Sequence, residues 1–134
     1  MTRSALLAVT AMLLVATGCG SDPESSPGGS GDDQRHPDIV EVQIEEQDGS
    51  YSLEVTVSSP YDSPERYADG WRVLGPDDTV HGEHRLLHDH AGEQPFTRTQ
   101  TGVEIPDDVD EVTVQGRDQE HGYGGATVTV AVPR

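Results

Sequence analysis

Alternation of apolar and polar residues, beginning at residue 38, is the feature that most constrains how this chain folds. Successive side chains of a β-strand point to opposite faces of a sheet, so a period of two predicts strands with one buried face. The segment Gln47-Asp48-Gly49-Ser50 separates two such runs and carries the Asp-Gly signal of a tight hairpin. The alternating apolar residues are Val40, Val42 and Ile44 before this turn, and Tyr51, Leu53, Val55 and Val57 after it.

Further runs of high β-propensity follow, and no window shows helical periodicity. Proline, glycine and aspartate separate these runs, as is typical of loops and turns. Strands are predicted over 67–74, 79–90, 96–103, 112–117 and 126–132, with loops over 58–65, 75–78, 106–108 and 118–125. About seven short strands with regularly spaced turns predict an all-β antiparallel β-sandwich, immunoglobulin-like or fibronectin type III-like, with Trp71 in its core.

The first nineteen residues have the organisation of an export signal. Arg3 precedes an apolar run from Ala5 to Ala16, which as a helix spans roughly 18 Å and is too short for a bilayer core of about 30 Å. Val15-Ala16-Thr17-Gly18-Cys19 then resembles the lipobox of bacterial lipoproteins. The resemblance implies that residues 1–18 are a signal peptide and that Cys19 carries the lipid, palmitate included, that anchors the protein to the membrane outside the cytoplasm.

Residues 20–37 consist largely of Gly, Ser, Pro and Asp, which predicts a disordered tether. About seventeen flexible residues have a root-mean-square reach of roughly 20–25 Å, enough to lift a domain off a membrane. The predicted organisation is therefore a signal peptide (1–18), a lipidated cysteine with its tether (19–37) and a single β-sandwich domain (38–134).

Charge and cysteine content narrow the function further. The chain has 25 acidic and 8 basic residues, for a net charge of −17, and loss of residues 1–18 removes Arg3 and no acidic residue. The negative electrostatic field of such a chain repels phosphate groups, so we expect no nucleic-acid partner. Genome composition and adaptation to a salty habitat both explain the acidity, and the sequence does not separate them. With Cys19 committed to lipid, no cysteine is left for a disulfide or for thiol chemistry.

Four of the six histidines fall between residues 81 and 90. On a predicted strand His88 and His90 share a face and lie about 6–7 Å apart, a spacing that suits zinc or copper. His84, Glu93 or His121 would complete the ligand set. The other interpretation is that these are loop histidines bonded to backbone and carboxylates. Weak calcium binding is also left open at Asp107, Asp118 and Glu120, although no EF-hand spacing is present.

Several short strings identify a resemblance. They are Tyr67-Ala68-Asp69-Gly70-Trp71, Leu86-Leu87-His88-Asp89-His90, Glu93-Gln94-Pro95-Phe96-Thr97-Arg98 and Gly122-Tyr123-Gly124-Gly125. Together they resemble a group of uncharacterised small exported bacterial proteins, the hypothetical lipoproteins. The resemblance covers most of residues 65–132 and implies a single domain, but no activity.

From these observations we expect a lipid-anchored, extracytoplasmic β-sandwich that is not an enzyme and requires no cofactor. Its predicted role is binding of a protein or glycan partner, or a structural role, at the cell envelope. The alternative is a zinc- or copper-binding envelope protein that uses the histidines named above. Metal-assisted hydrolysis ranks third, because it needs the same ligands and an open coordination position.

Overall fold

The structure, a computed structural model, describes residues 34–134. The predicted signal peptide, Cys19 and residues 20–33 of the predicted tether lie outside the described residues. The strands are β1 (Asp38–Gln47), β2 (Ser50–Ser58), β3 (Ala68–Leu74), β4 (Val80–Arg85), β5 (Phe96–Val103), β6 (Glu111–Asp118), β7 (Gly122–Tyr123) and β8 (Val128–Ala131). Residues 34–134 contain no helix, so the predicted all-β class is confirmed.

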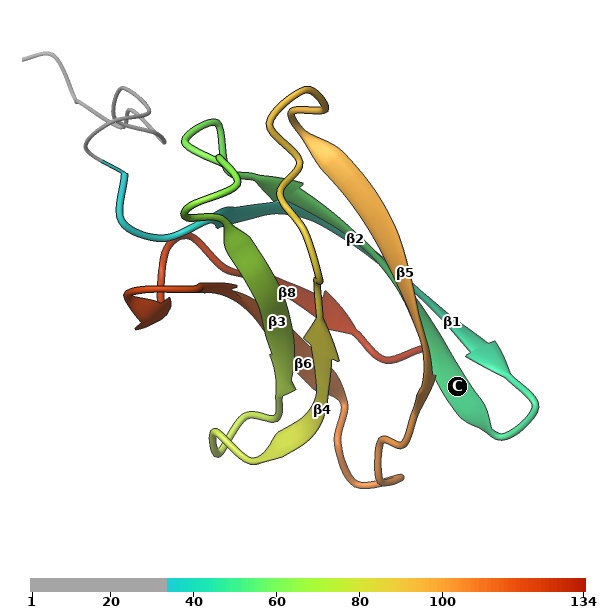
Figure 1. Cartoon of the computed structure of the whole chain (residues 1–134). Coiled ribbons are helices and arrows are strands. Elements are labelled where there is room, and N and C mark those ends of the chain that lie inside the picture. Colours follow the sequence, from blue (N-terminus) through green and yellow to red (C-terminus); the bar gives the residue numbers. More distant parts are fainter. Residues whose placement is uncertain (1–33) are drawn as a thin grey trace, which may run out of the picture.

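Two antiparallel sheets pack face to face as a β-sandwich (Figure 1). One sheet has the order β1-β2-β5, and the other has the order β4-β3-β6-β7 with β8 also paired to β6. The predicted sandwich is therefore confirmed. The β4 strand pairs with β3, whereas constant-type immunoglobulin domains place their fourth strand in the sheet of the first, second and fifth strands. The immunoglobulin-like or fibronectin type III-like type stays a prediction.

The β1–β2 hairpin forms where the Asp-Gly signal predicts it. Asp48 and Gly49 both have positive φ, at 53° and 86°, as a type I′ turn requires. A register shift between Ile39 and Glu41 changes the inward-facing set at the start of β1. Ile39 is buried and Val40 is half exposed, so the prediction that Val40 faces the core is wrong. A bulge of this kind adds a residue to one strand, and the simple period of two does not reveal it.

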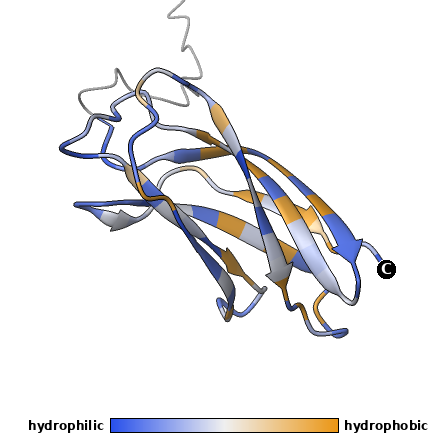
Figure 2. Cartoon of the chain, turned by 45° about the vertical axis from the view of Figure 1, so that its right-hand side comes forward, coloured by the Kyte–Doolittle hydropathy of each residue, from blue (hydrophilic) through white to orange (hydrophobic). Residues whose placement is uncertain are grey.

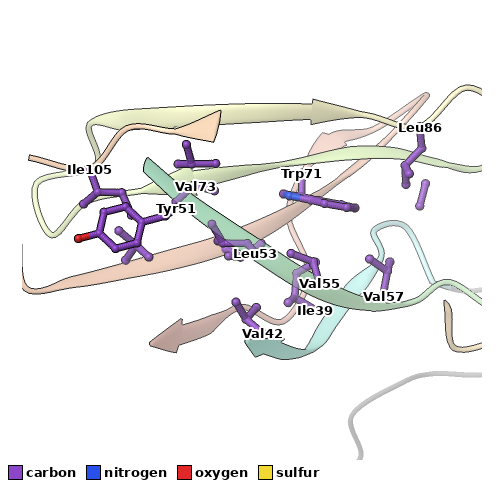
Figure 3. Packing of buried hydrophobic residues seen from close by; sticks show 14 of the residues in the cluster. Ile39, Val42, Tyr51, Leu53, Val55, Val57, Trp71, Val73, Leu86 and Ile105 are labelled. Atoms are coloured by element: carbon purple, nitrogen blue, oxygen red, sulfur yellow. The ribbon is translucent and has the colours of Figure 1, made fainter. Parts of the chain in front are cut away.

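The core lies between the sheets and contains side chains from both. Figure 2 shows hydrophobic and hydrophilic residues alternating along several strands, and in β2 and β6 the buried residues come from alternating positions. Trp71 is 1% exposed and lies among valines and leucines in the middle of the core (Figure 3). Its indole N–H donates to Gln100 Oε1 on the opposite sheet at 2.8 Å. Burying each Val or Leu side chain contributes about 1.5–3 kcal/mol, and these contributions hold a sandwich that has no disulfide available among residues 34–134.

The fourth strand is shorter than predicted, because its pairing with β3 stops at Arg85. Arg85 pairs with Gly70, and the Leu86 N–H donates to Asp69 O at the start of β3. Beyond this point no pairing with β3 follows, and residues 86–95 form a connection to β5 instead of the predicted strand up to His90. Leu86 is buried while Leu87 is 84% exposed.

The domain begins earlier than residue 38. Pro37 is fully buried, and a Cβ added at Gly116 would lie 2.7 Å from Pro37 Cγ, so the glycine permits this close approach. The Arg66 guanidinium donates to the carbonyl oxygens of Gln34 and Arg35 at 2.9 and 2.8 Å. Residues 34–37, which the sequence assigns to the tether, therefore belong to the packed domain.

The two ends of the sandwich have different surroundings (Figure 1). The near pole is the end where residue 34 joins the domain, and it holds the β2–β3, β4–β5 and β6–β7 connections. The far pole holds the β1–β2 turn, the β3–β4 turn at 75–79 and the β5–β6 connection at 104–110. This division places the candidate residues described below.

The β3–β4 pairing supplies a test of the fold. A Cβ added at Gly70 would lie 2.1 Å from the His84 carbonyl oxygen, a main-chain atom that cannot move away without breaking the pairing. We expect Gly70→Ala to lower the free energy of unfolding by about 3 kcal/mol, measured by chemical denaturation. Gly92→Ala is the matched control, because nothing lies within 4 Å of its added Cβ. Equal unfolding midpoints for the two variants would contradict the described pairing.

Candidate functional site

The predicted anchor and the described domain are separate parts of the chain. Among residues 34–134, no helix combines the length and the apolar character needed to cross a membrane. Cys19, the predicted lipid-bearing residue, lies outside the described residues. The candidate functional groups that the structure places are therefore those of the sandwich and its connections.

His88 and His90 come together, but in a loop and not on a strand. Both lie in the β4–β5 connection, so the predicted strand spacing is wrong, because β4 ends at Arg85. Their ring centroids are 4.7 Å apart. The His90 ring also stacks on Phe96 of β5 at a centroid distance of 3.9 Å. Only 5% of His90 is exposed, whereas His88 lies at the surface.

The other three predicted metal ligands lie in separate environments. His84 is on β4 and stacks on Trp71 at 4.3 Å. Glu93 accepts a hydrogen bond from the Arg98 guanidinium at 2.7 Å, and His121 lies in the β6–β7 turn, 6.2 Å from the His36 ring. In the part of the chain that the structure describes, no three His, Cys, Asp or Glu side chains are arranged to hold a metal ion. The zinc or copper site stays a prediction.

Burial sets the protonation of the two stacked histidines. Burial lowers the pKa of His90, and the Arg98 guanidinium and the His88 ring act in the same direction, while Asp62 and Glu93 oppose them. Burial also lowers the pKa of His84 below its ordinary value of 6.5. Both side chains are therefore held in the neutral form in the folded state, which suits their stacking on Phe96 and Trp71.

Asp62, a residue that sequence reasoning missed, fixes the β4–β5 connection. Its carboxylate is 6% exposed and accepts the N–H groups of Ala68 and His90 at 3.0 and 2.9 Å. Gln94 adds a second link, since it accepts the Ser59 N–H at 2.7 Å and donates to the His90 carbonyl at 3.1 Å. Two connections that are distant in sequence are thus held against each other at the near pole.

Asp118 plays the same part for the β6–β7 turn. It is fully buried and accepts the N–H groups of Glu120 and His121 at 2.9 and 2.8 Å, while Arg66 forms an ion pair with it at 3.2 Å. Burial raises the pKa of this carboxyl, but interactions with His121, Tyr61, Glu120 and Arg66 outweigh it and bring the pKa below its usual value. The carboxylate that the sequence left open for calcium is therefore engaged by protein donors.

The polar side chains on the outer face of the β4-β3-β6-β7 sheet also form hydrogen bonds and contacts with one another. The Arg72 guanidinium donates twice to Gln115 Oε1 and lies 4.0 Å from the Tyr123 ring centroid. The Tyr123 hydroxyl donates to Glu83 at 3.0 Å, so its side chain reaches from β7 across to β4. Arg117 pairs with Asp69 on β3. These contacts join all four strands and stabilise the sheet.

The far pole differs from the near pole, because it holds two hollows that are lined in part by carboxylates without a partner among residues 34–134. One hollow of about 330 Å³ is lined by Glu46, Gly49, Tyr51, Ile105, Asp107 and Arg134. A second, of about 380 Å³, shares Gly49 and Ile105 and adds His81, Glu104 and Pro106. Volumes near 300 Å³ are at the small end of those that hold ligands in proteins. No sequence signal marked this place, because its residues come from β1, β2, β4 and the β5–β6 connection.

Comparisons with known proteins show a similarity to a protein named as a lipoprotein. The chain is 36% identical over 99 residues to a protein of Halomicrobium mukohataei named "Putative lipoprotein". The match covers 73% of the chain and 48% of that protein, so the chain spans about half the length of the curated relative it matches. The predicted resemblance to uncharacterised lipoproteins is confirmed in this form. No family model matches the chain, and no solved structure matches it.

The buried histidine predicts a pH dependence of stability. Because folding lowers the pKa of His90, protonation favours the unfolded state, and the free energy of unfolding should fall as pH drops from about 8 to about 5. His90→Phe keeps a ring against Phe96 and removes the titrating group, so we expect a flatter profile in equilibrium denaturation. His88→Gln removes only a smaller contribution to this lowered pKa, so it should change the slope less than His90→Phe does. A slope that is identical in His90→Phe and in the unaltered protein would contradict this role.

The buried carboxylate of Asp118 predicts a large stability effect. Asp118→Asn removes the charge that Arg66 and two backbone N–H groups share, and we expect it to lower the free energy of unfolding by about 2–3 kcal/mol. Asp107→Asn is the matched control, because that carboxylate pairs with Arg134 while fully exposed, and we expect no measurable change in its denaturation midpoint. Similar midpoints for the two variants would show that the Asp118 network does not stabilise the domain.

Proposed function

We propose that the protein is a lipid-anchored binding module of the cell envelope, without catalytic activity, that presents its far pole to an envelope partner. The similarity to a lipoprotein supports the anchoring. The place where residue 34 joins the domain supports the orientation, since a tether from Cys19 reaches the near pole first. The two hollows at the opposite end are the observation on which the proposal rests.

The distribution of polar groups supports a binding role. At the near pole Asp62, Asp118 and His90 are engaged in contacts that hold the connections in place. At the far pole the side-chain carboxylates of Glu46 and Glu104 make no hydrogen bond or ion pair with any residue of 34–134. Charged groups that serve no internal contact and lie beside a hollow are available to a partner. The partner that we propose is a protein or a glycan of the envelope.

Anchoring is tested by removing the lipid attachment point. We expect Cys19→Ser to move the protein from the membrane fraction to the soluble extracytoplasmic fraction, because a thioether-linked lipid cannot form on serine. Ser21→Ala changes a nearby residue without touching the lipobox and should stay in the membrane fraction. Fractionation and metabolic labelling with a fatty acid measure the outcome. Membrane retention of Cys19→Ser after an alkaline wash would refute lipid anchoring.

Presentation of the far pole is tested by site-specific photo-cross-linking in intact cells. A photoreactive residue in place of Glu104, at the far pole, should capture envelope components. The same residue in place of Glu120, which is exposed at the near pole, is the matched control and should capture fewer. Capture from position 120 alone, or equal capture from both, would contradict the proposed orientation.

A further inference from the structure

We infer that Arg134 is the positioning residue of the far pole: its guanidinium holds the β5–β6 connection against β2 and thereby fixes the surface that a partner meets. This inference rests on the proposed function and names the residue on which the shape of its binding surface depends. Three observations carry it: the contacts of Arg134, the charge of the connection that it holds, and its place in one of the two hollows.

The Arg134 guanidinium joins β2 to the β5–β6 connection. Its Nη2 donates to two carbonyl oxygens of the connection, those of Pro106 and Val109, at 2.6 and 2.7 Å. Its Nη1 donates to the Tyr51 hydroxyl on β2 and to Asp107 Oδ1, both at 3.2 Å. A guanidinium is planar and presents its donors in a fixed fork, so these four contacts set the position of the connection relative to β2.

The backbone next to Arg134 is attached to the core. Val132 is buried, and its N–H donates to Asp110 O at 2.8 Å. The Tyr51 hydroxyl, which accepts from Arg134, donates in turn to Pro133 O at 3.3 Å. Tyr51 itself is 5% exposed and belongs to the core (Figure 3). The side chain that holds the connection therefore starts from a firm support.

The connection that Arg134 holds is strongly acidic. Residues 104–111 have no basic side chain and five acidic ones, namely Glu104, Asp107, Asp108, Asp110 and Glu111. Glu46, at the end of β1, lines the same hollow as Asp107 and Arg134. Carboxylates at this density repel one another, so the connection tends to move away from β1 unless a cation lies between them. Arg134 supplies that cation.

The first hollow depends on these contacts. Asp107 and Arg134 form part of the wall of this hollow of about 330 Å³. When Arg134 holds Asp107 and the two carbonyl groups beside it, that wall has one position. A surface that is ordered before binding loses less entropy when a partner binds, which raises affinity. Arg134 thus acts on binding through the connection.

Hydrogen exchange of the Val109 amide measures how firmly the connection is held, because this N–H donates to Pro106 O within it. In the full chain, solubilised in a nonionic detergent, we expect Arg134→Gln to speed this exchange by about tenfold or more. The Val55 amide, on the central strand β2, should exchange at an unchanged rate. Equal acceleration of both amides would indicate a loss of global stability and would overturn the inference.

Arg85→Gln is the matched control. It removes the same charge from an exposed side chain that makes no hydrogen bond or ion pair within residues 34–134. We expect it to leave Val109 exchange unchanged. An unchanged rate in Arg134→Gln, or the same acceleration in both variants, would overturn the inference.

Salt separates the charge of Arg134 from its hydrogen bonds. In Arg134→Gln the carboxylates of the connection lack a counter-charge, so raising NaCl from about 0.1 to about 1 M, which shortens the screening length from about 10 to about 3 Å, should slow Val109 exchange by about threefold. In the unaltered protein three of the four acceptors of Arg134 are uncharged, so the same change should have no effect. Salt-independent exchange in Arg134→Gln would overturn the electrostatic part of the inference.

Photo-cross-linking from position 104 connects Arg134 to partner binding. In intact cells we expect Arg134→Gln to lower capture from this position by about threefold or more, and Arg85→Gln to leave it unchanged. Faster Val109 exchange with unchanged capture would overturn the role of Arg134 in binding and leave the proposed function in place. Absence of capture from position 104 in the unaltered background would overturn the proposed function and, with it, that role.

Discussion

Two buried carboxylates, those of Asp62 and Asp118, hold the near pole together, and the positions of its other groups depend on them. Asp62 links the β2–β3 connection to the N–H of His90, and this places the His90 ring against Phe96. Asp118 orders the β6–β7 turn and holds Arg66, whose guanidinium in turn binds the carbonyl groups of residues 34 and 35. Each carboxylate accepts backbone donors that a loop would otherwise leave without partners, which offsets the cost of its burial. A chain without a disulfide in its described domain thereby obtains firm connections at one end.

This arrangement gives the molecule two unlike ends. At the near pole charged groups form internal contacts, and the segment that leads back to Cys19 joins the domain at this end. At the far pole the core ends in Tyr51 and Ile105, and two glutamates beside them have no internal partner. A firm attachment end and an opposite end with available charge are what a tethered binding module needs. The outer face of the β4-β3-β6-β7 sheet between the poles is polar and internally bonded, as the contacts of Arg72 with Tyr123 and of Tyr123 with Glu83 show.

A feature of the structure could be predicted from the sequence where residues that are neighbours in the chain determine it. The β1–β2 hairpin and β5 were predictable, because alternation and an Asp-Gly turn act over a few neighbouring residues. The end of β4 was not, since it depends on how far its pairing with β3 extends, and the burial of Ile39 in place of Val40 depends on a bulge. The sequence did bring attention to His88 and His90, which do meet, but it missed Asp62, whose role appears only when residues 68 and 90 come to lie beside it. An aspartate between two prolines is typical of a turn, and the sequence does not show which backbone N–H groups it accepts in the folded protein.

Hydrogen exchange of individual amides in the full chain, followed by mass spectrometry or NMR, tests whether the buried carboxylates make the near pole firm. The amides of His90, Glu120 and His121 lie in connections outside the regular strand pairing, yet a carboxylate accepts each of them. We predict slow exchange at these three positions, and fast exchange at Gly49 and in the exposed part of the 104–110 connection. Exchange of His90 and His121 as fast as that of the far-pole turns would contradict it.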